Sequence, residues 1–135
     1  MKFVFYFLLF ALLGYSVQSC KKDEGKRPVI EFRTGAGYTS SDTTVAVNSI
    51  VFIGLHAEKT EEEDVLKHFS ASESVDGGAN VTLDEAELSG ADADVYDVDY
   101  TFTIPAQAGH TYKLTFTVTN RDGLTNQVSL TLTSI

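Results

Sequence analysis

The amino-acid sequence predicts an all-β fold, an antiparallel β-sandwich of about seven strands. Three observations support this class. Apolar residues recur at every second position in several segments, which is the period of a half-buried strand. Turn-forming residues separate these short segments. No segment after residue 20 has the spacing of a long amphipathic helix.

The last third of the chain shows the alternation best. Residues Tyr112–Thr119 place apolar side chains at every second position, with Lys or Thr between them. Asn120–Gly123 follows, and its Asp-Gly pair is typical of a hairpin turn that needs positive φ. Val128, Leu130 and Leu132 then alternate with polar residues. The sequence therefore predicts a closing antiparallel hairpin.

Two earlier segments also have strand character. One row of alternate apolar residues ends before Pro105, and it consists of Tyr96, Val98, Tyr100, Phe102 and Ile104. Ser49–Glu58 is apolar on both faces, which favours a central strand that is covered on both sides or meets a neighbour.

The remaining strands are shorter. Val29, Phe32 and Tyr38 belong to an opening strand that Gly35 and Gly37 interrupt, at a bulge or a change of sheet. Residues Thr43–Val47 would continue that strand. Val65–Ser72 fits either a strand or a helical turn, and Val81–Leu83 fits a short edge strand.

Two segments resemble bacterial immunoglobulin-like modules. YKLTFTVTNRDGLTNQVSLTLT is similar to the last hairpin of bacterial Ig-like and PKD-like domains, and GYTSSDTTVAVNSIVFIGLHA is more loosely similar. The resemblance implies an Ig-like β-sandwich over residues 28–135. The Cys and Trp hallmarks of antibody domains are absent, because this region has neither residue. Such sandwiches carry many unrelated functions, so the fold does not identify the ligand.

The N-terminus has the layout of a signal peptide over residues 1–19. Lys2 precedes the apolar block Phe3–Tyr15, and the small polar segment Ser16–Ser19 follows it. The block is shorter than the roughly 20 apolar residues that a membrane-spanning helix needs. Cys20 comes directly after this segment, at the position where a thiol can be acylated as the first residue of the cleaved chain.

This region resembles bacterial lipoproteins of the signal-peptidase-II type. Val17 and Ser19 are variants of the usual residues before the lipid-bearing cysteine, while Gln18 departs from that pattern. Three following residues are similar to the export signal of Bacteroidetes surface lipoproteins: Lys22, Asp23 and Glu24. The resemblance implies that Cys20 carries the lipid and that residues 20–27 form a lipidated flexible tether. It also implies a location at the bacterial outer membrane, on the cell surface, with the membrane bound through the lipid.

The charge balance restricts the partners. The chain has 10 Lys and Arg against 19 Asp and Glu, and Lys2 would leave with the signal peptide. A surface of this sign repels phosphate backbones and anionic head groups. We therefore expect no nucleic-acid partner and no electrostatic docking to a membrane.

Candidate chemical groups are few, and no cofactor is expected. The three histidines, His56, His68 and His110, lack the spacing of a metal site, and His56 is expected to be half-buried in its strand. The acidic run Glu61–Asp64 is expected to be a solvated loop. Four carboxylates are calcium candidates: Asp92, Asp94, Asp97 and Asp99. The alternative for these four is an acidic face that discourages edge pairing.

A glycosidase would need two carboxylates beside aromatic platforms. The chain has no Trp, and Tyr96, Tyr100 and Tyr112 lie on rows assigned to the core. A catalytic function is therefore not expected. For sugar binding the most available groups are Tyr38 and the loop Val75–Asn80, whose glycines also suit a simple turn.

These observations favour a lipid-anchored Ig-like module that binds a protein or glycan partner at the cell envelope. One alternative is an accessory subunit that captures polysaccharide for an uptake system. Another is a calcium-dependent or hydrolytic domain that uses the Asp92–Asp99 cluster.

Overall fold

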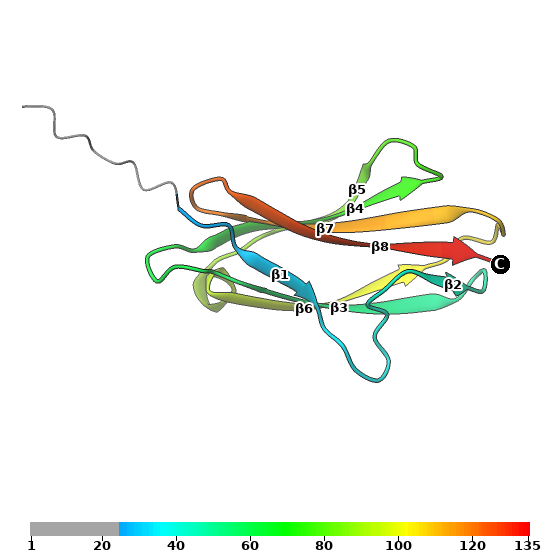
Figure 1. Ribbon diagram of the computed structural model, residues 1–135, viewed down its shortest axis with the longest axis horizontal. Helices are drawn as coiled ribbons and strands as arrows, with labels where there is room; N and C mark the ends of the chain where they lie inside the picture. The colour runs from blue at the N-terminus through cyan, green and yellow to red at the C-terminus, as the bar shows by residue number, and fades with distance from the viewer. Residues whose placement is uncertain (1–24) are drawn as a thin grey trace, which may run out of the picture.

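The computed structural model describes residues 25–135, which form two β-sheets (Figure 1). The three-stranded sheet has the order β1 (Val29–Phe32), β3 (Ile50–Glu58) and β6 (Val95–Thr103). The five-stranded sheet has the order β2 (Thr43–Val45), β8 (Thr125–Ser134), β7 (Thr111–Asn120), β4 (Leu66–Val75) and β5 (Val81–Glu87). One 3₁₀ turn, η1 (Gly90–Ala93), lies between β5 and β6. The all-β class is confirmed.

The two sheets face each other across a core rich in aromatic rings. The Phe116 ring on β7 lies 5.2 Å from the Tyr100 ring and 6.3 Å from the Phe32 ring, both on the facing sheet. Phe69 on β4 contacts Tyr96 in the same way, with ring centroids 5.3 Å apart. The predicted alternate rows are thus the inner faces of the sheets, and their burial supplies the main driving force for folding.

The chain changes sheet after β1. Gly35 and Gly37 have φ values of +146° and +98°, and the chain then passes from the three-stranded sheet to β2 in the other sheet. This is one of the two outcomes expected at these glycines. The prediction of a purely antiparallel fold is wrong for β2, which pairs in parallel with β8. A tight hairpin forces two strands to run antiparallel. β2 is not joined to β8 by a hairpin, because the chain reaches it by crossing between the sheets, so the two strands can run parallel.

The two ambiguous segments are both strands. The segment that also fitted a helical turn is β4, a ten-residue strand held between β7 and β5. Tertiary pairing decides this case, because Phe69 and Ala71 must both face the core. The short strand expected at Val81–Leu83 continues to Glu87 as β5.

β3 is the central strand of its sheet, and its outer face is covered only in part, where Tyr38 and Arg33 pack on the buried Gly54. Val51, Ile53 and Leu55 are buried against the other sheet. Ile50 and Phe52 point the other way and keep 57% and 50% of their surface exposed. Within residues 25–135, no second layer lies over these two side chains.

A buried amide joins the N-terminal segment to the rest of the domain. The Asn120 side chain donates to the Lys26 carbonyl at 3.0 Å and to the Asp64 carboxylate at 2.6 Å, and it accepts from the Leu124 backbone at 2.8 Å. Asp64 is only 1% exposed, so the prediction of a wholly solvated acidic run is wrong at this residue. The hydrogen bond from the Asn120 amide replaces part of the hydration that the Asp64 carboxylate loses on burial.

The predictions for the N-terminus lie outside the described residues. These are the signal peptide over residues 1–19, the lipid attachment at Cys20 and the export signal Lys22, Asp23 and Glu24. Lys26 and Arg27, which were assigned to the tether, hydrogen-bond to the domain through their backbone atoms. No helix among residues 25–135 is both long and apolar enough to cross a membrane.

Candidate binding face

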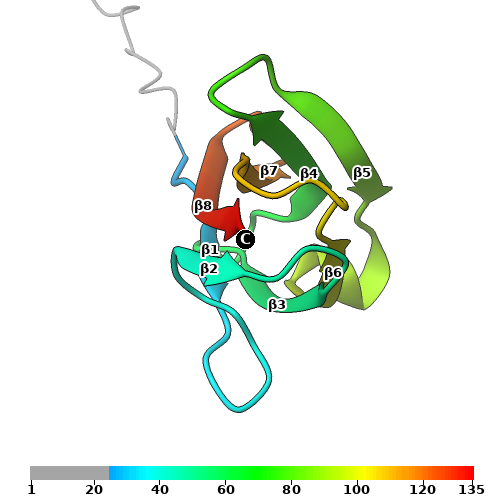
Figure 2. The ribbon, with the colours of Figure 1, turned by 90° about the vertical axis from the view of Figure 1, so that its right-hand side faces the viewer.

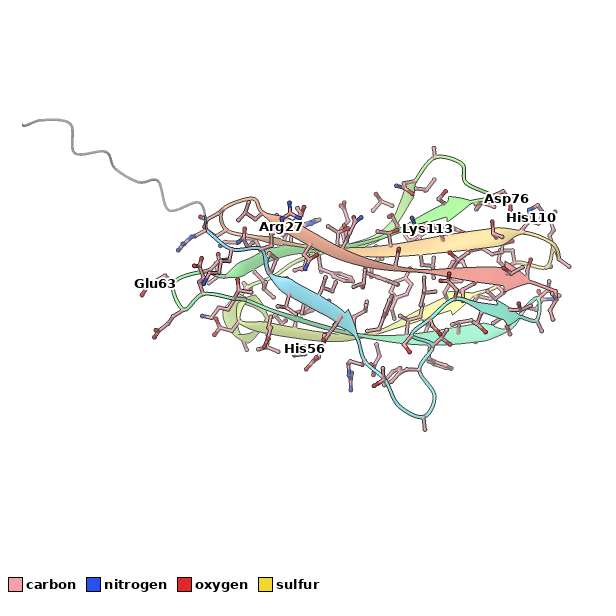
Figure 3. The ribbon with its side chains drawn as sticks, viewed as in Figure 1. Arg27, His56, Glu63, Asp76, His110 and Lys113 are labelled. Carbon is pink, nitrogen blue, oxygen red and sulfur yellow. The ribbon has the colours of Figure 1, made fainter. Side chains whose placement is uncertain are left out.

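The candidate site is the outer face of the three-stranded sheet, here called the exposed sheet face. It is formed by outward side chains of β3 and β6 and by two residues that pack on them, and it includes Ile50, Phe52, His56, Asp97, Asp99, Arg33 and Tyr38. His56 marks this face in Figure 3, on the side of β3 that is turned away from the second sheet. Strand alternation puts these residues outside because their neighbours form the core.

Tyr38 packs on this face at Gly54 of β3. The loop after β1 folds back, and the Thr39 backbone donates to the Phe52 carbonyl at 2.7 Å. A Cβ atom built on Gly54 would lie 3.0 Å from two ring carbons of Tyr38 and 2.9 Å from the Cβ of Arg33. Only glycine at position 54 therefore allows the ring to approach the strand so closely.

The polar groups of Tyr38 and Arg33 converge on Asp99. Oδ1 of Asp99 accepts from the Tyr38 hydroxyl at 2.7 Å and from Arg33 Nη1 at 2.9 Å. The guanidinium also lies over the Tyr38 ring, 5.1 Å from its centroid. The hydrogen bond to Asp99 raises the pKa of the Tyr38 phenol. Asp99 and Arg33 thus hold the Tyr38 ring in place, and the Asp99–Arg33 bond joins these two partners to each other.

His56 lies on the outer face of β3 and is half-buried there, as expected, with 28% of its side chain exposed. Its Nδ1 atom lies 2.7 Å from Oδ1 of Asp97, directly across the strand pair, and its Nε2 atom lies 3.8 Å from the Glu58 carboxylate. The hydrogen bond to Asp97 raises the pKa of His56 above its ordinary value, and burial opposes this only in part.

The His56–Asp97 contact predicts a pH-dependent contribution to stability. Because the folded pKa of His56 is raised, the contribution is full below the unfolded pKa of about 6.5 and is lost as pH rises through the folded value. Asp97→Asn should therefore lower the urea midpoint more at pH 6 than at pH 9, and NMR should show a lower pKa for His56. In a His56→Gln background the same substitution should have an effect that does not change with pH. Equal effects at both pH values in the native background would contradict the prediction.

The four calcium candidates do not converge. Asp97 and Asp99 do lie on one face of β6, as predicted. However, Asp97 contacts His56, Asp99 contacts Arg33, and Asp94 contacts Lys59 at 2.7 Å. Asp92 lies in η1. Among residues 25–135, no group of three or more His, Cys, Asp or Glu side chains is placed to hold a metal ion.

The loop Val75–Asn80 lies at the opposite end of the domain from Arg27 (Figure 3). Asp76 and Gly77 have positive φ, as a tight turn requires. The Asp76 carboxylate accepts from the Thr111 backbone at 2.8 Å and lies 2.6 Å from His110 Nδ1. The Thr111 backbone bond is the main cause that lowers the pKa of Asp76. These contacts favour the turn role over the sugar-binding role for this loop.

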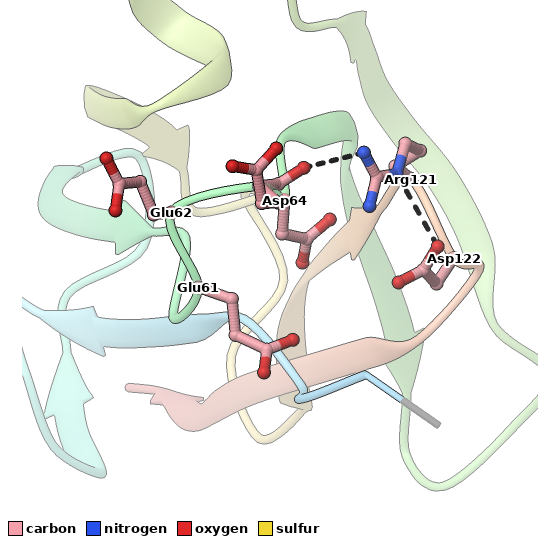
Figure 4. Close-up of a pocket in the computed structure, with 6 residues that line it drawn as sticks. Glu61, Glu62, Asp64, Arg121 and Asp122 are labelled. Carbon is pink, nitrogen blue, oxygen red and sulfur yellow. Dashed lines mark hydrogen bonds and ion pairs between the residues drawn. The ribbon is translucent and has the colours of Figure 1, made fainter. Parts of the chain in front are cut away.

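A hollow of about 240 Å³ lies at the N-terminal end (Figure 4). It is lined by Glu61, Glu62, Glu63, Asp64, Arg121 and Asp122. The Arg121 guanidinium donates to the Glu63 carbonyl at 2.6 Å and lies 3.5 Å from the Asp122 carboxylate. Arg121 therefore holds two loops together at this hollow, next to the buried Asp64.

The comparisons with known proteins concern the fold alone. No protein-family model matches the chain, and the comparison with curated proteins gives no match. A superoxide reductase (neelaredoxin) from Ignicoccus hospitalis is similar in structure, with a TM-score of 0.57 and 11% identity over 82% of this chain and 81% of that chain. A variant of that protein has a TM-score of 0.57 and 12% identity over 87% of each chain.

A CARDB domain from Pyrococcus furiosus is also similar, with a TM-score of 0.48 and 14% identity over 80% of this chain and 97% of that chain. At such low identities, the likeness to the superoxide reductases shows a shared fold and says nothing of activity.

Sequence reasoning found part of this face. Tyr38, Asp97, Asp99 and His56 were singled out, but Arg33 and Phe52 were not. Phe52 could have been found, because the segment Ser49–Glu58 has apolar residues on both faces and Phe52 is one of them. The Arg33–Asp99 pair left none, since it depends on the register between strands that are far apart in the sequence.

Proposed function

We propose that this chain is a lipid-anchored, cell-surface module with an immunoglobulin-like β-sandwich over residues 28–135. Its role is non-catalytic binding of a protein or glycan partner at the bacterial envelope, through the exposed sheet face. The observation that carries the proposal is the half-exposed Phe52 on the same sheet face as a Tyr38 ring that Arg33 and Asp99 hold in place. Rigid aromatic groups outside the core are typical of binding surfaces.

The second candidate is a subunit that captures polysaccharide for an uptake system. It is favoured by the combination of the half-exposed Phe52 ring with a carboxylate and a guanidinium on one sheet face. A sugar can stack on the Phe52 ring and hydrogen-bond to the charged groups of Asp99 and Arg33. The two candidates share one surface, so the ligand that binds there distinguishes them.

The binding role can be tested with the chain that lacks residues 1–20, applied to a glycan array and to extracted envelope proteins. Phe52→Ala should weaken binding by about fivefold or more, as expected for an aromatic anchor. Ile135→Ala, which shortens another exposed apolar side chain, should leave the affinity unchanged. Binding to proteins alone would exclude polysaccharide capture, and equal affinity of the Phe52 variant would exclude this face.

The anchoring role predicts that Cys20→Ala moves the full chain from the membrane fraction to the soluble fraction. Each buried methylene of an acyl chain is worth about 0.8 kcal/mol, so two or three chains anchor durably while none does not. Ser16→Ala, in the same segment, should leave the protein with the membranes. Fractionation followed by immunodetection measures the result. A Cys20 variant that stays in the membrane pellet would contradict lipid anchoring.

A further inference from the structure

β5 is an open edge of the five-stranded sheet. It is the last strand in the sheet order, and Figure 2 shows it on the flank of the molecule, away from β8. Its residues are exposed except for the partly buried Ala86, and Val81 keeps 60% of its surface. The strand contains no Pro, and its charged residues Asp84, Glu85 and Glu87 are all acidic, so they oppose pairing with an acidic strand but not with a basic one. Its register with β4 shifts beside Leu83, so the regular part of the edge is Asp84–Glu87. Its outward backbone groups therefore form a template for one more strand.

Most of the charge on this flank is negative. Between residues 69 and 109 the chain has nine acidic residues and no Lys, Arg or His. Four of them lie on β5 or on its neighbour β4, namely Glu73, Asp84, Glu85 and Glu87. Within residues 25–135, Glu87 has one partner, His68 at 3.9 Å, and the other three form no ion pair.

The carboxylates stand on both sides of this edge. Asp84 pairs with the buried Ala71 and so faces the core side, while Glu85 pairs with Ser70 on the outer side. Glu73 lies opposite the buried Leu114, and desolvation raises its pKa. A strand added along Asp84–Glu87 would therefore meet carboxylates with both of its faces.

Aromatic rings of the facing sheet adjoin the inner carboxylates. Tyr96 and Tyr100 on β6 both have a raised pKa, first from burial and then from the negative charge of Asp84. β6 is itself an edge strand, and it lies below β5 on the same flank (Figure 2). The negative charge of the inner carboxylates therefore extends across this flank to β6.

We propose that β5 binds an extended, lysine- or arginine-rich segment of a partner protein as an added β-strand. Backbone pairing along the open edge would supply affinity, and the carboxylates on both faces would select basic side chains. A second copy of this chain does not fit, because like charges placed opposite each other destabilise a strand pair. This surface is separate from the exposed sheet face, so the inference goes beyond the function proposed above.

The test uses the full chain in an uncharged detergent and a short fluorescent peptide rich in lysine and valine, with lysines on both faces of the extended strand. Fluorescence anisotropy should show binding at low salt. The double variant Asp84→Asn/Glu85→Gln should weaken it by about fivefold, as expected for two exposed charge contacts. The matched variant Glu62→Gln/Glu63→Gln, which removes the same charge from a distant loop, should change the affinity less than about twofold.

A second peptide separates strand addition from general charge attraction. N-methylation at alternate residues keeps every lysine but removes the pairing N–H groups, and it should abolish binding. Phe52→Ala should leave the peptide affinity unchanged, so a failure here is distinguishable from a failure at the sheet face. The proposal is overturned if the basic peptide does not bind, if the methylated peptide binds equally well, or if both charge variants weaken binding to the same extent.

Discussion

Replacing Asn120 with alanine should lower the free energy of unfolding by about 3 kcal/mol, because it leaves buried polar groups unpaired. The side chain donates to the Asp64 carboxylate and the Lys26 carbonyl and accepts from the Leu124 backbone. Asp64 is 1% exposed, so water cannot readily replace the lost donor. Urea denaturation followed by circular dichroism measures the loss.

Asn126→Ala provides the matched control. That side chain donates to the Pro28 carbonyl at 3.0 Å in a partly buried setting, and it accepts from the Gln127 backbone at 2.9 Å in an exposed one. Its loss should cost only about 1 kcal/mol. Asn120→Ala and Asp64→Ala should also combine to less than the sum of their separate effects, because each removes the same contact. Equal losses for Asn120→Ala and Asn126→Ala would show that the buried amide has no special role.

The same residue shows where sequence reasoning ends. Asn120 was recognised as the start of a hairpin turn, and the turn is present because the sequence Asn-Arg-Asp-Gly encodes it locally. Its burial could not be foreseen, since its partners Lys26 and Asp64 lie 94 and 56 residues away. Asp64 was placed with its exposed acidic neighbours for the same reason. Local chemistry predicts a turn, while a buried contact depends on which segments the fold brings together.

For the strands too, the sequence predicts local features but not the pairing of distant segments. Alternation alone identified the inner rows of β6, β7 and β8, because residues of one face must be apolar wherever the sheets meet. The parallel pairing of β2 with β8 was missed, since three residues carry no sign of their direction. On the exposed sheet face, the Tyr38–Asp99 bond joins residues 61 apart, so the sequence could name both groups but not their contact.

The two proposed surfaces arise from the same mismatch between the sheets. Five strands face three, so β5 extends along the flank where the smaller sheet ends at β6. The three-stranded sheet in turn exposes its outer face at Phe52, where no further layer lies within the described residues. Residues that the core does not use are therefore available for partners at both places. The two sheets of unequal size are held together by the core between them, and Phe116 lies at the centre of its aromatic contacts.

Phe116→Ala should destabilise the protein by about 4 kcal/mol, because truncation of a fully buried ring removes apolar burial and leaves a cavity. Its ring contacts Phe32 and Tyr100 on the facing sheet and Phe69 on its own, so the cavity would open between the two layers. Phe52→Ala makes the same truncation on the outer face and should cost less than about 1 kcal/mol. Urea midpoints of both variants measure the difference. Similar losses for the two phenylalanines would mean that the sheets do not pack through Phe116.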